Sequence, residues 1–327
     1  MSSPRRLLFL HTGGTLGMKG DPGPLAPSHY SETVLPFVRG LDELAEIEHS
    51  YLCNIDSSDM TPALWEALAA TIAQGLDRFD GFVVLHGTDT MAYSASALSY
   101  LLQDLPKPVI FTGAQRPLAH LRSDGRQNLV HAAICATLDV PEVGVFFSRR
   151  LTRGNRTTKS SVQSYDAYRS PGLAPLVKMG VDIDYPMAAR RPAGPFRLRA
   201  GFDERVAVLH LFPHIPARTL DALVDDGVRA VLLLAFGAGN LPLTGWPRSI
   251  ERATQAGVAV IVGTQCIDGS ADLGRYAGSA AARDAGALGA GSMTVEGALT
   301  KAMFLLGQSD EAEQFRLSWG LDLAGEL

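Results

Sequence analysis

Two threonines lie beside glycines in this sequence, and each carries a hydroxyl that can serve as a nucleophile. Thr12 belongs to residues 12–15 (TGGT), and Thr88 belongs to residues 87–90 (GTDT). A threonine hydroxyl is a weak nucleophile at neutral pH and needs a neighbouring base or a lowered pKa. The backbone N–H groups of the glycine-rich loop at Thr12 can also stabilise a developing oxyanion. The alternative is that both stretches are ordinary strand-to-helix turns with capping side chains.

Lys159 is the candidate base for this chemistry. Only five of the 29 basic residues are lysines, so the chain strongly favours arginine. An arginine does not lose its proton in a protein, whereas a buried lysine can. Thr88, Asp89 and Lys159 would then supply a hydroxyl, an orienting carboxylate and a proton-accepting amine. The alternative is that Lys159 only pairs with a nearby carboxylate.

The motifs of several other enzyme classes are absent. There is no Gly-Lys pair for a P-loop, no G-x-G-x-x-G, no G-x-S-x-G and no H-E-x-x-H. The three cysteines are too few for a zinc site or a disulfide framework, and the eight histidines show no ligand spacing, so we expect them to be structural or exposed. We therefore expect no metal and no cofactor.

Composition and charge restrict the partners. The chain has 327 residues, of which 46% are hydrophobic and 19% charged, which is enough apolar material for a sizeable core. A net charge of −5 argues against a nucleic-acid partner. The apolar run after Arg5 and Arg6 has four residues, too few for a signal peptide, and no run reaches membrane-spanning length. With its scattered cysteines, the chain is expected to be cytoplasmic, with no membrane partner.

Alternating strands and helices must position these residues. Short apolar runs predict strands at 7–11, 82–86, 109–112 and 143–147, and helical periodicity predicts helices at 62–76, 91–102 and 128–138, the first of them capped by Thr61 before Pro62. Strands that are apolar on both faces and separated by helices indicate a mostly parallel sheet flanked by helices, an α/β fold. Ligands bind outside the carboxyl ends of such strands, where both threonines fall.

The segment 182–204 interrupts the alternation with three prolines and four arginines. We predict an N-terminal catalytic α/β domain at 1–181, an interdomain linker at 182–204 and a smaller C-terminal α/β domain at 205–327. Strands at 206–211, 231–236 and 258–262 and a helix near 295–306 are expected in the C-terminal domain.

Taken together, three stretches make the sequence resemble the bacterial L-asparaginase family, in its type I, cytoplasmic form. They are residues 12–17 (TGGTLG), 86–91 (HGTDTM) and 153–159 (RGNRTTK), accompanied by 56–60 (DSSDM) and 113–117 (GAQRP). The resemblance runs in order from about residue 8 to about residue 306 without a large insertion. It implies an amidohydrolase that converts L-asparagine to L-aspartate and ammonia.

The resemblance also implies catalytic roles. Thr12 would attack the side-chain amide carbon of asparagine to give a β-aspartyl ester. Thr88, Asp89 and Lys159 would activate the hydroxyl chemistry and the hydrolytic water.

Substrate binding and assembly are implied in the same way. Ser57 would hold the substrate α-carboxylate and Asp89 its α-ammonium group, while Asp56 and Ser58 would line the pocket. Asn240 resembles a residue that neighbouring subunits bring to the site. The family forms an intimate dimer, often doubled to a tetramer.

Two further positions concern the lid and regulation. In the family, the loop after the first strand usually carries a tyrosine that closes over the nucleophile. Here Pro24 occupies that position, and Tyr30 is the nearest phenol, so Tyr30 is the candidate lid residue. Cys266 follows a strand where type I enzymes can carry an effector pocket.

Other functions compete with asparagine hydrolysis. The closest is a glutaminase-asparaginase of broader specificity, because one methylene changes discrimination by only about 10- to 200-fold. An asparaginase-like component of a tRNA-dependent amidotransferase would need an extra N-terminal domain and a basic face. A catalytically silent amino-acid-binding regulator would be expected to have lost Thr12, Thr88, Asp89 or Lys159.

Overall fold

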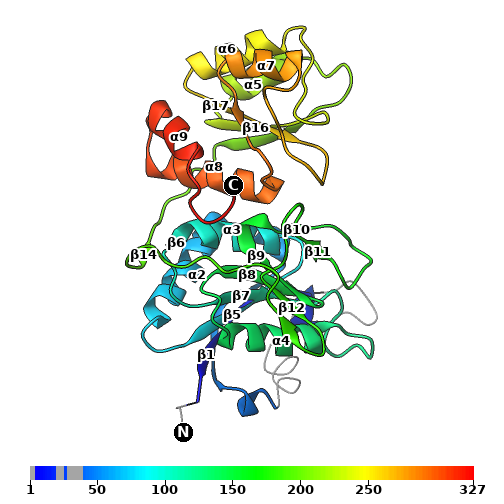
Figure 1. The fold of residues 1–327 in the computed structure, drawn as a ribbon, viewed down its shortest axis with the longest axis vertical. Helices are drawn as coiled ribbons and strands as arrows, with labels where there is room; N and C mark the ends of the chain where they lie inside the picture. Colours follow the sequence, from blue (N-terminus) through cyan, green and yellow to red (C-terminus); the bar gives the residue numbers. More distant parts are fainter. Residues whose placement is uncertain (1–3, 20–25, 28–39) are drawn as a thin grey trace. The chain divides into compact units, whose positions relative to one another are not determined.

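The computed structural model describes residues 4–19, 26–27 and 40–327. The chain forms two compact units, Met1–Arg199 and Ala200–Leu327. We call them the first and second units (Figure 1).

The first unit contains an eight-stranded sheet. β4, β1, β5, β7 and β8 run parallel, and β9, β12 and β13 continue the sheet in antiparallel pairs. The prediction of a mostly parallel sheet flanked by helices is therefore confirmed. In spatial order the strands are β13 (Ile183–Asp184), β12 (Val177–Met179), β9 (Arg150–Arg153), β8 (Val143–Phe147), β7 (Val109–Thr112), β5 (Gly81–Leu85), β1 (Arg6–Gly13) and β4 (Glu46–Ile55).

Helices cover both faces of this sheet. α2 (Pro62–Gly75) and α3 (Met91–Leu101) lie on one face, and α4 (Gly125–Thr137) lies on the other (Figure 1). The predicted cap of α2 is confirmed, because the Thr61 hydroxyl accepts the Leu64 N–H at 3.4 Å and Pro62 stands in the first turn.

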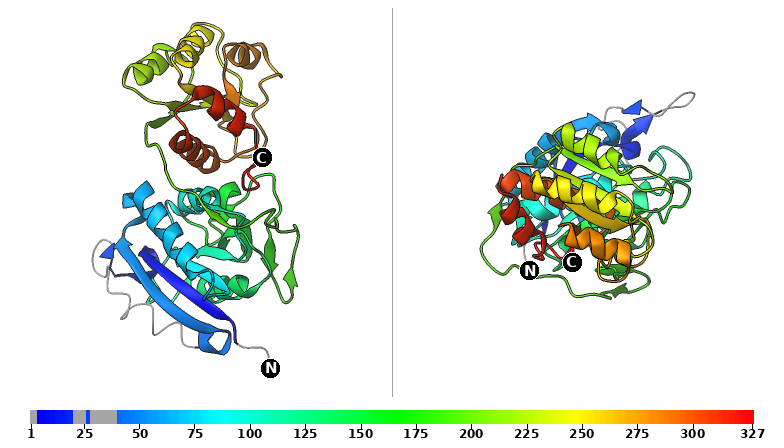
Figure 2. Two further views of the ribbon diagram at one scale, coloured as in Figure 1. Left: turned by 90° about the vertical axis from the view of Figure 1, so that its left-hand side faces the viewer. Right: turned by 90° about the horizontal axis from the view of Figure 1, so that it is seen from above.

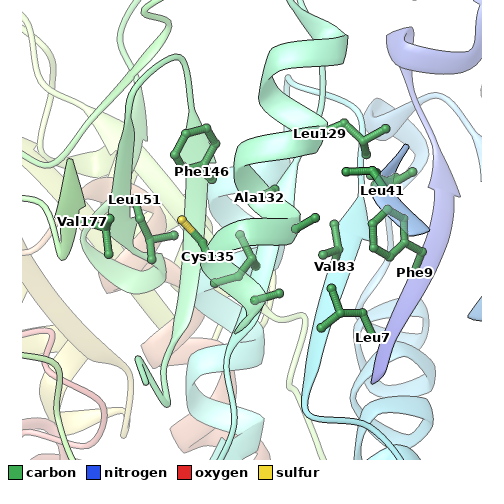
Figure 3. Close-up of a cluster of buried hydrophobic side chains, with 14 of the residues drawn as sticks. Leu7, Phe9, Leu41, Val83, Leu129, Ala132, Cys135, Phe146, Leu151 and Val177 are labelled. Carbon is green, nitrogen blue, oxygen red and sulfur yellow. The ribbon is translucent and has the colours of Figure 1, made fainter. Parts of the chain in front are cut away.

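The core under α4 fixes the strands that carry the candidate residues. Leu129, Ala132 and Cys135 of α4 share one buried cluster with Phe9 of β1 and Val83 of β5 (Figure 3). Fully burying a side chain of the size of leucine or phenylalanine stabilises a fold by about 1.5–3 kcal/mol. The cluster therefore holds β1 and β5 firmly, and their carboxyl ends lead to Thr12 and Thr88.

Short elements complete the first unit. A two-stranded hairpin formed by β10 (Thr158–Lys159) and β11 (Tyr168–Arg169) carries the candidate lysine. The others are η1 (Thr15–Gly17), β2 (Met18–Lys19), β3 (Ala26–Pro27), η3 (Leu41–Glu43), η4 (Ser57–Asp59), β6 (Leu102–Gln103), η5 (Gly154–Arg156) and β14 (Arg197–Leu198).

The second unit is a smaller α/β layer structure. Its four strands are all parallel, in the order β15 (Val206–His210), β16 (Ala230–Ala235), β17 (Ala259–Thr264) and β18 (Leu288–Gly289). Helices cover both faces of this sheet (Figure 2). They are α5 (Arg218–Asp225), α6 (Trp246–Gln255) and α7 (Ala277–Asp284), opposite α8 (Val295–Gln308) and α9 (Ala312–Trp319).

The proline- and arginine-rich segment 182–204 divides between the units, whose boundary falls after Arg199. Its first part belongs to the first unit, because β13 pairs with β12 and β14 pairs with β6. Asp104 also holds this part, since one carboxylate oxygen accepts the backbone N–H groups of Ala193 and Gly194 at 2.8 and 3.2 Å.

Candidate active site

Glycines allow three loops to meet at the carboxyl ends of neighbouring parallel strands. Thr12 is the next-to-last residue of β1, Ser57 follows β4 and Thr88 follows β5. A Cβ atom built on Gly14 would lie 2.4 Å from the backbone of Gly87, and one on Gly87 would lie 2.6 Å from the Ser57 side chain. Gly14 also has a φ of +92°, a backbone conformation that residues with a side chain rarely adopt. Any other residue at these positions would push the loops apart.

Thr12 is buried against the strand that precedes Thr88. Its hydroxyl donates to the carbonyl of Leu85 at 2.9 Å, and only 2% of the residue is exposed. The thiol of Cys53 on β4 contacts the Thr12 carbonyl at 3.4 Å. The hydroxyl proton is therefore held by a carbonyl, and the oxygen must pass this proton to a base when it attacks an electrophile.

The structure brings Thr88, Asp89 and Lys159 into direct contact. The Lys159 ammonium nitrogen lies 2.9 Å from the Thr88 hydroxyl oxygen and 2.6 Å from a carboxylate oxygen of Asp89. The lysine side chain is 15% exposed, whereas that of Asp89 is 69% exposed. A half-buried basic group beside a hydroxyl, with a solvent-facing carboxylate next to it, is suited to moving a proton between the hydroxyl and a reactant.

The chain leading to Lys159 is buried and held by side-chain hydrogen bonds. The Arg153 guanidinium donates two hydrogen bonds, of 2.6 and 3.0 Å, to the carboxylate of Glu142, and both side chains are almost fully buried. The Thr157 hydroxyl donates to the Arg153 carbonyl at 2.6 Å. It also lies at hydrogen-bond distance, 2.7 Å, from the Thr152 hydroxyl. The bidentate Arg153–Glu142 pair fixes the geometry of this loop and therefore limits the positions that Lys159 can take.

The loop after β4 has its own internal hydrogen bonds. The Asp56 carboxylate accepts the backbone N–H and the hydroxyl of Ser58 at 2.9 and 2.8 Å, which lowers the pKa of the Asp56 carboxyl. Ser57 is buried, and its carbonyl accepts the Thr90 hydroxyl at 2.7 Å. The Thr90 bond joins this loop to the one that carries Thr88 and Asp89.

A buried, neutral histidine supports the Thr88 loop. His86 Nδ1 lies 2.7 Å from the Gly87 carbonyl, so this nitrogen carries the proton, and Nε2 accepts from the Ser94 hydroxyl at 2.8 Å. The indole N–H of Trp65 donates in turn to Ser94 at 2.8 Å. Burial lowers the pKa of His86 to about 4, against the opposing effect of the Gly87 carbonyl.

This histidine makes the stability of the first unit depend on pH. The pKa of His86 is about 4 in the fold, against 6.5 for an ordinary histidine, so below pH 6.5 the unfolded chain binds a proton that the folded chain does not. Stability is therefore lost as the pH falls from 6.5 towards 4, by about 3 kcal/mol. We expect His86→Gln to lose less stability than the wild type between pH 7.5 and 4.5, measured by urea unfolding.

The exposed His210 on β15 provides the control, and His210→Gln should keep the wild-type pH dependence. Equal losses in the His86→Gln variant and the wild type would show that other groups cause the acid sensitivity.

Four of the remaining predicted features lie outside the described residues or in the second unit. Tyr30 and Pro24 lie outside the described residues. Asn240 follows β16 in the second unit, where it forms an isolated bridge with Phe236. Cys266 is exposed in the second unit, and its backbone N–H donates to the Thr264 hydroxyl at 3.0 Å. Their roles remain predictions.

Sequence reasoning missed the supporting residues. It gave no role to Arg153, and it did not identify Glu142 or Tyr168, whose hydroxyl donates to the Thr88 carbonyl. Among the described residues, no group of three or more His, Cys, Asp or Glu side chains is arranged to hold a metal ion. Within the same part of the chain, every helix is too short or too polar to cross a bilayer.

Comparison with known proteins shows the family of this chain. Residues 6–190 match the family model for the N-terminal domain of asparaginase, and residues 205–317 match that for the glutaminase/asparaginase C-terminal domain. The chain is 39% identical over 331 residues to L-asparaginase 1 of Escherichia coli K12, covering 99% of this chain and 98% of that protein.

Two further similarities bear on the interpretation. The crystal structure of L-asparaginase I from Vibrio cholerae superimposes with a TM-score of 0.90 at 36% identity, covering 99% of both chains. A glutamyl-tRNA(Gln) amidotransferase component of Pyrococcus horikoshii is 34% identical over 336 residues, covering 98% of this chain and 76% of that protein. With both domain models matched in order along the same two-unit fold, the chain belongs to the asparaginase family.

Proposed function

We propose that this protein hydrolyses L-asparagine to L-aspartate and ammonia, with Thr12 as the nucleophile. The observation that carries the proposal is the contact of Lys159 with both Thr88 and Asp89, at 2.9 and 2.6 Å, in a loop that packs on the loop after Thr12. A nucleophilic hydroxyl needs a nearby group that can take its proton, and this cluster provides one.

The first half of the reaction forms an ester. The Thr12 oxygen attacks the side-chain amide carbon of asparagine, and its proton passes to a base. The amide nitrogen takes up a proton and leaves as ammonia, which yields a β-aspartyl ester on Thr12. Backbone N–H groups of the glycine-rich loop after Thr12 would stabilise the tetrahedral oxyanion.

The second half returns the free hydroxyl. A water molecule attacks the ester carbonyl and gives up a proton to the Thr88–Lys159 pair. The bond from the carbonyl carbon to the Thr12 oxygen breaks, the oxygen regains a proton and aspartate leaves. The same pair can serve both halves because it acts as a proton acceptor and then as a donor.

The substrate's charged groups require two kinds of contact. We assign the α-ammonium group to the exposed Asp89 carboxylate and the α-carboxylate to Ser57, on loops that the Thr90–Ser57 bond joins at 2.7 Å. Asp56 and Ser58 would line the same pocket. We further propose a cytoplasmic dimer or tetramer in which Asn240 of a neighbouring copy reaches the site.

Ammonia release from L-asparagine is the expected result of the first assay. We expect turnover by the purified protein without added metal or nucleotide, and unchanged turnover after incubation with a chelator. L-glutamine across the same concentrations measures the breadth of specificity, because the second family model matched covers both amides. Activity that a chelator abolishes and zinc restores would contradict the threonine mechanism.

A further inference from the structure

A second side chain from the lysine hairpin reaches Thr88. Tyr168 lies on β11, and its hydroxyl donates a hydrogen bond to the backbone carbonyl of Thr88. Tyr168 is 3% exposed and Thr88 is 6% exposed, so this bond is shielded from water. A buried carbonyl without a hydrogen-bond partner is unfavourable, and the Tyr168 hydroxyl supplies that partner to the Thr88 carbonyl.

The register of the hairpin explains why both side chains reach the same residue. Lys159 on β10 is paired directly with Tyr168 on β11 in the antiparallel ladder. Directly paired residues project their side chains to the same side of the ribbon. One hairpin therefore holds Thr88 at two points, with Lys159 at the hydroxyl oxygen and Tyr168 at the carbonyl oxygen.

The Tyr168 ring is itself fixed from the large sheet. It packs on Phe147 of β8, with ring centroids 5.0 Å apart and an angle of 56° between the planes. The hairpin loop is also tied down, because the Gln115 side chain donates to the Ser164 carbonyl at 3.2 Å. The hydroxyl is thus held in place independently of its bond to Thr88.

We propose that Tyr168 is a positioning residue for the Thr88–Lys159 pair. By holding the Thr88 carbonyl, it fixes the backbone of Thr88 relative to the hairpin that carries Lys159, and so sets the 2.9 Å separation between the amine and the hydroxyl. This inference rests on the proposed function, since the separation matters only if the pair moves a proton.

Tyr168→Phe tests the inference with the packing on Phe147 retained. We expect kcat for asparagine to fall about tenfold, since small misplacements of reacting groups are costly. KM should change by less than about threefold, because the Ser57 loop is held by its own bonds and the loss concerns a contact used in the chemical step. Melting temperatures of the variant and the wild type establish that both are folded at the assay temperature.

Tyr165→Phe is the matched control. Tyr165 belongs to the same hairpin, and its hydroxyl donates to the Arg122 carbonyl at 2.6 Å, not to Thr88. It should keep wild-type kcat and KM. A kcat loss of the same size in Tyr165→Phe would overturn the proposal, because any weakening of the hairpin would then suffice.

A double-mutant cycle separates alignment from general support. In a Lys159→Met background, measured by single-turnover ammonia release with enzyme in excess, Tyr168→Phe should change the rate less than about twofold. A tenfold loss that persists without the amine would overturn the positioning role. If the wild type releases no ammonia, the proposed function fails; if the wild type is active and Tyr168→Phe keeps full kcat, only the role of Tyr168 fails.

Discussion

Thr12→Ala is expected to lower kcat for asparagine by about three orders of magnitude or more, the scale of loss when a nucleophile is removed. Thr88→Val should have an effect of the same order. Valine keeps the shape of threonine but removes the oxygen that lies 2.9 Å from the Lys159 amine. Ammonia release measured at high enzyme concentration detects the slow turnover that remains after such a loss of kcat.

The two substitutions should be grossly non-additive, because both residues serve one reaction. Thr71→Val is the matched control, since Thr71 in α2 donates to the Ala67 carbonyl at 2.9 Å, the distance at which Thr12 donates to Leu85. It should keep nearly wild-type kcat. If Thr12→Ala or Thr88→Val kept more than about a tenth of wild-type turnover, that threonine would have to be reassigned to a structural turn.

The parts of the fold that could be predicted are those with strong local signals. Strands β5, β7 and β8 are buried on both faces and therefore appear in the sequence as continuous apolar runs. β4 (Glu46–Ile55) escapes sequence reasoning because its residues alternate between exposed and half-buried, and it lies at the sheet edge. Its polar residues, such as Glu46 and Glu48, hide it from a search for apolar runs.

The segment 182–204 shows how a correct local signal can lead to an incomplete prediction. Its prolines prevent long strands and helices, so its sequence predicts an interdomain connection. The structure instead assigns its first part to the first unit, where Asp104 accepts from Ala193, Gly194 and Arg197. These contacts depend on a carboxylate about 90 positions away, which no local pattern reveals.

In the candidate site, too, some residues could be predicted from the sequence and others could not. Thr12 and Thr88 could be found because glycine-flanked residues at strand ends have a known place in parallel sheets. The Arg153–Glu142 pair and the Tyr168–Thr88 bond could not, since each depends on tertiary packing. A hydroxyl that binds a backbone carbonyl leaves no trace in the sequence, because every residue offers such a carbonyl.

Lys159→Arg is expected to fold and to bind aspartate, yet to lose at least about 100-fold in kcat, the scale expected when general acid–base catalysis is removed. Arginine keeps the positive charge and can still pair with Asp89, but its guanidinium does not deprotonate. The lysine amine, in its neutral form, can accept a proton from the Thr88 hydroxyl, 2.9 Å away. The substitution therefore separates proton transfer from charge.

Lys159→Met removes both the proton-accepting amine and the positive charge. This variant should lose turnover as well as the contact to Asp89. Stability should fall by no more than about 1 kcal/mol, because an ion pair with one solvent-exposed partner contributes little and water can solvate the carboxylate that remains. The Asp89 side chain is 69% exposed, so its carboxylate is hydrated when the lysine is gone. Urea unfolding of the wild type and of the Lys159→Met and Lys159→Arg variants measures these changes in stability.

The decisive measurement is kcat together with aspartate affinity, on the same preparations, across pH 6–10. Lys178→Arg is the matched control, since Lys178 is exposed on β12 and should tolerate the exchange. For Lys159→Arg we expect nearly normal aspartate binding with a large loss of kcat at every pH. Near wild-type turnover would instead mean that Lys159 acts as a fixed charge that orients Asp89. The proton acceptor for Thr88 would then have to be another group, and the two-point hold of the hairpin on Thr88 would serve binding, not proton transfer.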